Sequence, residues 1–141
     1  MHHRLKEIKL IVVDIDGTLV DHQGMVGEKT LTLAKELKKK GILCTLSSAR
    51  SFHYSSHIAD ELEIDIPFVT LDGALIKARN SKAVYKGSIK KTLITKAIAL
   101  AEDNYGKITM CDENNLFVTP RNAVVKEYTK LNAPVKEVAD F

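Results

Sequence analysis

The chain has 141 residues, enough for a modest hydrophobic core, and its 45% hydrophobic and 28% charged residues are ordinary for a soluble protein. A formal net charge of +3 is too small to indicate nucleic-acid binding, and no segment has the length and apolarity of a signal peptide or membrane span. We therefore expect a cytoplasmic protein with no nucleic-acid or membrane partner. Cys44 and Cys111 fall in predicted strands without metal-ligand spacing, so both are expected to be buried free thiols.

The first predicted strand, residues 8–14, ends in two carboxylates. Apolar, largely β-branched residues lead to Asp14, and Asp16, Gly17 and Thr18 follow directly. Side-chain alternation along an extended segment would point Asp14 and Asp16 in the same direction. Two neighbouring carboxylates repel each other unless a cation lies between them, and closely placed oxygens suit Mg²⁺. Since open α/β sheets bind ligands where their strands end, the pattern predicts a metal site here.

Alternating helices and strands are predicted next. Apolar residues at helical spacing alternate with short apolar runs, which predicts helix, strand, helix and strand over residues 28–40, 42–46, 52–62 and 67–71. Gly41 follows the first of these helices, as expected for a helix-ending glycine. A strand–helix–strand–helix–strand order indicates right-handed crossovers and a parallel sheet. The fold class is therefore α/β, with a partial Rossmann-like parallel core.

Polar residues also follow the second and third predicted strands. Ser48, Ala49 and Arg50 precede a helix, so a hydroxyl, a cation and the first helical amides could bind one anion. The alternative is that Ser48 only caps the helix. Asp72 and Gly73 follow the third strand, and the alternative there is a plain turn into a hairpin.

The pattern changes after Gly73. A hairpin is predicted over residues 74–86, and a helix over 88–104 begins with Ser88 as its N-cap. Two strands (107–111 and 116–119), a helix (122–131) and a last strand (135–138) complete the chain. This change in style places a domain boundary between residues 1–86 and 87–141, with the second part of α+β type.

The three polar loops together resemble a known enzyme family. Asp14-Ile15-Asp16-Gly17-Thr18 is similar to the first motif of the haloacid dehalogenase-like phosphohydrolases. Ser48-Ala49-Arg50 and Asp72-Gly73-Ala74 resemble the Thr-Gly-Arg and Asn-Gly-Ala motifs of its Cof-type subgroup, which carries an α/β cap. Ala49 in place of Gly and Asp72 in place of Asn depart from the subgroup pattern.

The resemblance implies roles for these residues. Asp14 would be the nucleophile and Asp16 the general acid/base. Mg²⁺ would be held by the Asp14 carboxylate and the main-chain carbonyl of Asp16. The remaining motif residues would bind phosphate and substrate: Gly17, Thr18, Ser48, Ala49, Arg50, Asp72 and Gly73.

The family also uses a later Lys and a later Gly-Asp-x-x-x-Asp motif, which this chain does not contain. We therefore expect the N-terminal portion of a capped enzyme, with residues 1–86 as part of the core and 87–141 as part of the cap. Weak Mg²⁺ binding follows, because the later acidic ligands are missing. An unfinished sheet also leaves open strand edges, which pairing with a second copy in a homo-oligomer would cover.

The function implied is a Mg²⁺-dependent phosphatase that acts on a small phosphorylated metabolite through an aspartyl-phosphate. One alternative is a catalytically inactive module that binds phosphate or a partner. Phosphomutase-type transfer and a D-x-D glycosyltransferase are the others. Arg121 and Lys126 in the predicted cap could contact a substrate anion, whereas His53 and His57, four residues apart, are more typical of a solvated helix face than of a metal site.

Overall fold

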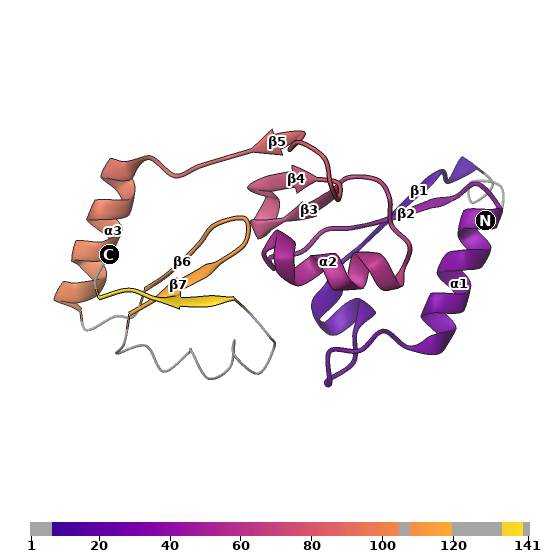
Figure 1. Cartoon of the computed structure of the whole chain (residues 1–141), viewed down its shortest axis with the longest axis horizontal. Coiled ribbons are helices and arrows are strands. Elements are labelled where there is room, and N and C mark those ends of the chain that lie inside the picture. Colours follow the sequence, from indigo (N-terminus) through magenta and orange to yellow (C-terminus); the bar gives the residue numbers. More distant parts are fainter. Residues whose placement is uncertain (1–6, 105–107, 120–133, 140–141) are drawn as a thin grey trace. The chain divides into compact units, whose positions relative to one another are not determined.

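The computed structural model describes residues 7–104, 108–119 and 134–139. The chain divides into two compact units, Met1–Lys86 and Gly87–Phe141, which are described separately. The described part of the first unit contains, in chain order (Figure 1), β1 (Leu10–Val13), α1 (Glu28–Lys39), β2 (Leu43–Leu46), α2 (Phe52–Glu61), β3 (Phe68–Thr70), β4 (Leu75–Lys77) and β5 (Tyr85–Lys86).

Parallel pairing organises the start of this unit. β1 and β2 are parallel, with Leu10 opposite Leu43, and a parallel bridge between Ser47 and Val69 continues the order to β3. The predicted parallel α/β arrangement is thus confirmed for β1 and β2. β3 in addition forms an antiparallel hairpin with β4, in which Thr70 lies opposite Leu75, and β4 pairs with β5. The sequence predicted the β4–β5 hairpin but not the β3–β4 pair.

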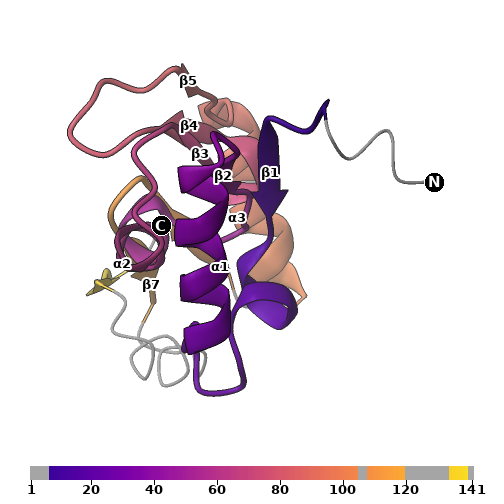
Figure 2. The ribbon, with the colours of Figure 1, turned by 90° about the vertical axis from the view of Figure 1, so that its right-hand side faces the viewer.

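In the first unit, the two predicted helices, α1 and α2, form close to the expected limits. α1 begins after Gly27 with Glu28 in its first turn and ends with Lys38 and Lys39, charges that suit the two ends of the helix dipole. Gly41, at φ 73°, ends the helix in the left-handed conformation that glycine adopts readily. Figure 2 shows α1 lying in front of β2, with β1 beside it.

The core of the first unit is formed where α1, α2 and the strands meet. Phe68, Leu46, Ile58 and Ile15 are fully buried and lie in one cluster. The rings of Phe68 and Phe52 stack with their centroids 4.9 Å apart. Burial of these side chains supplies most of the driving force that holds the polar loops in place.

The opposite face of the β1–β2 pair is apolar and open to solvent. Leu10 and Val12 on β1 share this face with Leu43 on β2, and all three side chains are exposed. No described residue of the first unit pairs with the other edge of β1. Self-association through this surface stays a prediction.

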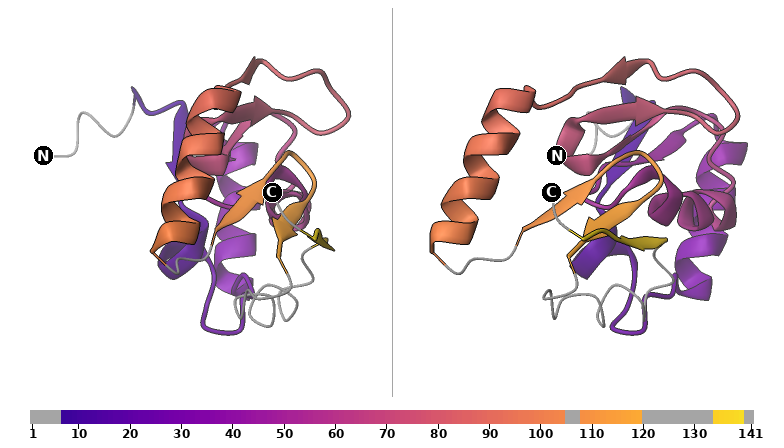
Figure 3. Two further views of the ribbon diagram at one scale, coloured as in Figure 1. Left: turned by 90° about the vertical axis from the view of Figure 1, so that its left-hand side faces the viewer. Right: turned by 60° about the vertical axis from the view of Figure 1, so that its left-hand side comes forward.

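The second unit contains α3 (Lys91–Asp103), β6 (Thr109–Cys111), β7 (Leu116–Val118) and β8 (Val135–Glu137). Figure 3 shows the β6–β7 hairpin, and β8 runs parallel to β7. These strands confirm the predicted ones. The predicted helix over residues 122–131, with Lys126, lies outside the described residues, as does Arg121.

Two predictions about the second unit are wrong. Ser88 does not cap the helix, because α3 begins only at Lys91, after an extended Lys90, beyond the two or three residues that a capping hydroxyl reaches. Cys111 is exposed rather than buried, because it is the last residue of β6, an edge strand of the described sheet. Cys44 on β2 is half-buried, and desolvation raises the pKa of both thiols.

Apolar residues recur along α3 at helical spacing, but the described residues do not bury them. Leu93 and Leu100 are exposed, and no residue of α3 is fully buried. Among the described residues, none of the helices combines the length and apolarity needed to cross a membrane.

Candidate active site

Main-chain hydrogen bonds join the first residues after β2 to the ends of β1 and β3. The Ser47 amide donates to the carbonyl of Val13 at 2.9 Å, and the Ser48 amide donates to the carbonyl of Val69 at 3.0 Å. The three strand ends therefore lie side by side, and the predicted site residues of all three loops are brought to the same edge of the first unit. Carboxyl ends of parallel strands are where open α/β sheets bind ligands.

The loop after β1 carries the two carboxylates. β1 ends at Val13, Asp14 is extended, and a kinked helical turn over Ile15–Leu19 follows. Buried Ile15 anchors this turn in the core, while Asp14 and Asp16 are exposed. Because the strand ends at Val13, strand alternation does not determine where the two carboxylates point. No described residue forms a hydrogen bond or ion pair with the Asp14 carboxylate.

Gly17 lies where the chain changes direction in this loop. Its φ of 72° lies in the left-handed region, and a Cβ placed there would contact nothing within 4 Å. We expect Gly17→Ala to lower the free energy of unfolding by about 1 kcal/mol through backbone strain alone. Gly17→Asn, which tolerates this conformation better, should lower it less. Urea denaturation of the two variants measures the difference, and equal losses would contradict a purely conformational role.

Asp16 is held by Arg50 from the loop after β2. The Arg50 Nε and Nη2 groups donate to the two Asp16 carboxylate oxygens at 2.7 and 2.6 Å. The Arg50 side chain is only 12% exposed, whereas that of Asp16 is 62% exposed. The hydrogen bond from Arg50 lowers the pKa of Asp16 below its usual value of 3.8, so Asp16 is ionised at neutral pH.

This ion pair should make stability depend on acid pH. Since the pKa of Asp16 is lower in the folded chain than in the unfolded chain, its contribution is present above about pH 3.8 and is lost as pH falls through the folded-state pKa. We expect Arg50→Met to remove this contribution, which stays below about 1 kcal/mol because Asp16 is exposed. Thermal unfolding at pH 7 and pH 3 measures it. A wild-type–variant difference that does not shrink at pH 3 would contradict the assignment.

Ser48 lies below the surface of the site. It is buried, and its Oγ accepts a hydrogen bond from the Arg50 amide at 3.1 Å. The N-cap of α2 is Ser51, so the alternative that Ser48 only caps this helix is wrong. Ala49 is not among the residues with positive φ, so the departure from glycine introduces no left-handed strain.

The loop after β3 adopts an unusual conformation. Leu71 and Asp72 both have φ 52° and Gly73 has φ 91°. These residues form the turn between β3 and β4, which agrees with the turn interpretation, and the Asp72 amide donates to the Ser48 carbonyl at 3.4 Å. Left-handed conformation at a leucine is strained by about 1–2 kcal/mol, and such strain often lies at functional sites.

A magnesium ion fits the oxygen donors of the first loop only in part. The Asp14 carboxylate and the Asp16 carbonyl are ligands of the type that Mg²⁺ prefers, whereas the Asp16 carboxylate is paired with Arg50. No group of three His, Cys, Asp or Glu residues that could hold a metal is found among the residues described. His53 and His57 are exposed on α2, as expected for a solvated helix face.

Sequence reasoning missed Tyr54. This residue lies on the first turns of α2, is buried, and places its ring centroid 5.7 Å from the Arg50 Cζ. An aromatic residue four positions after a cation, at the start of a helix, is the only sequence signal that could have identified it.

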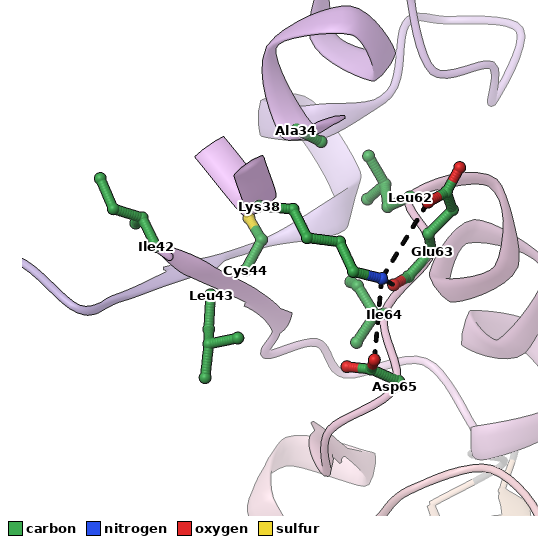
Figure 4. A pocket seen from close by; sticks show the side chains of 9 residues that line it. All are labelled: Ala34, Lys38, Ile42, Leu43, Cys44, Leu62, Glu63, Ile64 and Asp65. Carbon is green, nitrogen blue, oxygen red and sulfur yellow. Dashed lines mark hydrogen bonds and ion pairs between the residues drawn. The ribbon is translucent and has the colours of Figure 1, made fainter. Parts of the chain in front are cut away.

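A small pocket elsewhere in the first unit does not belong to this site. It lies between α1, the start of β2 and the segment after α2 (Figure 4), with space for about one water molecule. The Lys38 side chain extends along the pocket. Its Nζ donates to the Glu63 carbonyl at 2.9 Å and lies 3.6 Å from an Asp65 carboxylate oxygen. A surface ion cluster beside the pocket thus joins α1 to the segment after α2.

The fold and site together define an α/β protein whose acidic loop, buried serine and strained turn converge at the ends of adjacent strands. Residues 11–141 match the haloacid dehalogenase-like hydrolase family, and the chain belongs to this family. The resemblance seen in the sequence is thus confirmed.

Three known proteins illustrate the relationship. An HMP-PP phosphatase of Klebsiella pneumoniae is 31% identical over 78 residues, which cover 55% of this chain and 29% of that protein. A 5-amino-6-(5-phospho-D-ribitylamino)uracil phosphatase of Bacillus subtilis is 33% identical over 67 residues, covering 48% and 25%. The solved structure of the subclass IIB sugar phosphatase BT4131 has a TM-score of 0.77 at 24% identity, covering 92% of this chain and 52% of that one. The chain spans about half the length of the known proteins it matches.

Proposed function

We propose that this chain carries the nucleophile and phosphoryl-binding part of a Mg²⁺-dependent phosphatase for small phosphorylated metabolites. One observation carries the proposal. The exposed Asp14 carboxylate has no partner among the described residues, and the hydrogen bond between Ser47 and Val13 brings the residues next to them, Ser48 and Asp14, to adjacent strand ends. Residues 1–86 would be part of the catalytic core and residues 87–141 part of the cap. The names of the relatives, which include an HMP-PP phosphatase and a sugar phosphatase, support the substrate class.

The resemblance to the family assigns the chemistry of the two carboxylates. An Asp14 oxygen attacks the phosphorus of a phosphomonoester, an aspartyl-phosphate bond forms, and the bond to the leaving oxygen breaks. Asp16 delivers a proton to that oxygen and later accepts one from the water that hydrolyses the acyl-phosphate. Mg²⁺ held by Asp14 and the Asp16 carbonyl would supply positive charge beside the phosphoryl oxygens. Since Asp16 is ionised and paired with Arg50, this pair must open or loosen before Asp16 can carry a proton.

Binding of inorganic phosphate tests the proposal. With Mg²⁺ present, phosphate is expected to shift the amide NMR signals of Gly17, Thr18 and Ala49. Ser48→Ala should weaken the affinity about tenfold, because it removes one hydrogen bond to a charged group. Ser56→Ala is the matched control, since the Ser56 hydroxyl donates to the Phe52 carbonyl within α2.

The outcomes separate the alternatives. The absence of phosphate-dependent shifts at millimolar concentration would overturn the proposal. Phosphate binding without phosphate release from an aryl phosphate would instead favour the catalytically inactive binding module. Formation of a phosphorylated sugar in place of free phosphate would indicate phosphomutase-type transfer.

A further inference from the structure

Arg50 is the residue at which the three loops meet. Its guanidinium binds Asp16 in the loop after β1, its amide donates to the Ser48 Oγ, and its carbonyl accepts a hydrogen bond from the Leu71 amide at 2.9 Å. The backbone of Arg50 is therefore fixed by neighbours on both sides. The orientation of its long side chain depends on what surrounds the guanidinium.

The guanidinium is already engaged on two sides. One edge of the planar group forms the bidentate contact with both Asp16 oxygens, at 2.7 and 2.6 Å. The Tyr54 ring, 5.7 Å from the Arg50 Cζ, lies within the range of a cation–π interaction. Arg50 would have to give up two short charge-assisted hydrogen bonds before it could bind a phosphoryl group in the same way.

Tyr54 is well placed to keep Arg50 in this arrangement. α2 is anchored in the core through Phe52 and Ile58, so the Tyr54 backbone is carried on a rigid element. The Tyr54 side chain is itself buried. Since the ring presents negative potential to a cation, it restricts the rotamers of Arg50 as well as attracting its charge.

We propose that Tyr54 is a positioning residue of this site, which supports the Arg50 guanidinium and through it fixes the direction of the Asp16 carboxylate. In this arrangement Arg50 acts on Asp16 rather than as a ligand of the phosphoryl group. The catalytic consequence rests on the proposed function, because it assumes that Asp16 takes part in proton transfer. The contact itself does not depend on that assumption.

The NMR signal of the Arg50 Nε–H group tests the contact directly in the full chain. Tyr54→Leu is expected to raise the hydrogen-exchange rate of this group about 3- to 10-fold, whereas Tyr54→Phe, which retains the ring, should change it less than about twofold. The amide of Ile64, which donates to the Ala59 carbonyl of α2 at 2.8 Å, is the internal control and should keep its exchange rate. A general loosening of the unit would raise both rates together.

Tyr54→Met provides the same comparison should Tyr54→Leu fail to fold, because its flexible side chain fills much of the space without a ring. An unchanged Arg50 signal in the folded non-aromatic variant, or an equal rise in the exchange rates of the Arg50 Nε–H and the Ile64 amide, would overturn the inference. Where the wild-type chain turns over an aryl phosphate, the variant should lower kcat about 3- to 10-fold with KM within about twofold. Failure of phosphate binding in the wild type would overturn the proposed function, while the exchange rates still decide the role of Tyr54.

Discussion

Replacing Asp14 by Asn is expected to lower phosphate release from an aryl phosphate by about 10³-fold or more. The amide has nearly the shape of the carboxylate, but it is a poor nucleophile and carries no charge to hold Mg²⁺. Since the Asp14 carboxylate is exposed and has no partner among the described residues, the change should leave the fold intact. Release of nitrophenol from its phosphate ester in the presence of Mg²⁺ measures the loss.

Asp21→Asn is the matched control for this variant. Asp21 is another exposed carboxylate of the same segment, but it accepts hydrogen bonds from the Gln23 and Met25 amides. Binding of beryllofluoride, followed by fluorine NMR, provides a readout that needs no turnover, because the adduct forms on a carboxylate in place of the phosphoryl group. Equal activity, or an equal adduct, in Asp14→Asn and the wild type would remove Asp14 from the nucleophilic role.

The elements that the sequence predicted well are those with local signals. The apolar run that ends at Val13 fixes β1, and Gly27 and Gly41 bracket α1. Ser88 failed as a helix start because a serine can precede a helix without capping it. The β3–β4 hairpin was missed because it depends on left-handed φ at Leu71, which a sequence pattern does not encode.

In the site, too, features set by the order of strands could be predicted, whereas a side-chain contact between residues far apart in sequence could not. The convergence of Asp14 and Ser48 could be predicted, because both residues follow adjacent parallel strands. The partner of Arg50 could not, since its long side chain can reach either a phosphoryl group or Asp16. The structure shows the Arg50 guanidinium bound to Asp16, with the Tyr54 ring 5.7 Å from its Cζ. The sequence also could not show whether alanine in place of glycine at position 49 is strained. The structure shows that it is not, because the φ of Ala49 is not positive.

The strongest effect on stability is expected from Phe68→Ala. The Phe68 side chain has no exposed surface, and it stacks on Phe52 at 4.9 Å, with an angle of 7° between the ring planes. Truncation removes buried apolar surface and leaves a cavity between β3 and α2, which together lower the free energy of unfolding by about 3–5 kcal/mol. Far-UV circular dichroism during urea denaturation measures this change, since the chain has no tryptophan.

An effect of this size on stability should also lower phosphate binding at the site. Single domains are stable by about 5–15 kcal/mol, so Phe68→Ala should leave the first unit close to unfolding. Phe68 begins β3, which leads into the Leu71 loop, and Phe52 begins α2, which follows the Arg50 loop. Phosphate binding at these loops should therefore fall in proportion to the fraction of folded chain. Tyr85→Ala, at an exposed aromatic residue on β5, should change stability by less than about 0.5 kcal/mol. A loss below about 1 kcal/mol for Phe68→Ala would show that this aromatic pair does not hold the strand ends together.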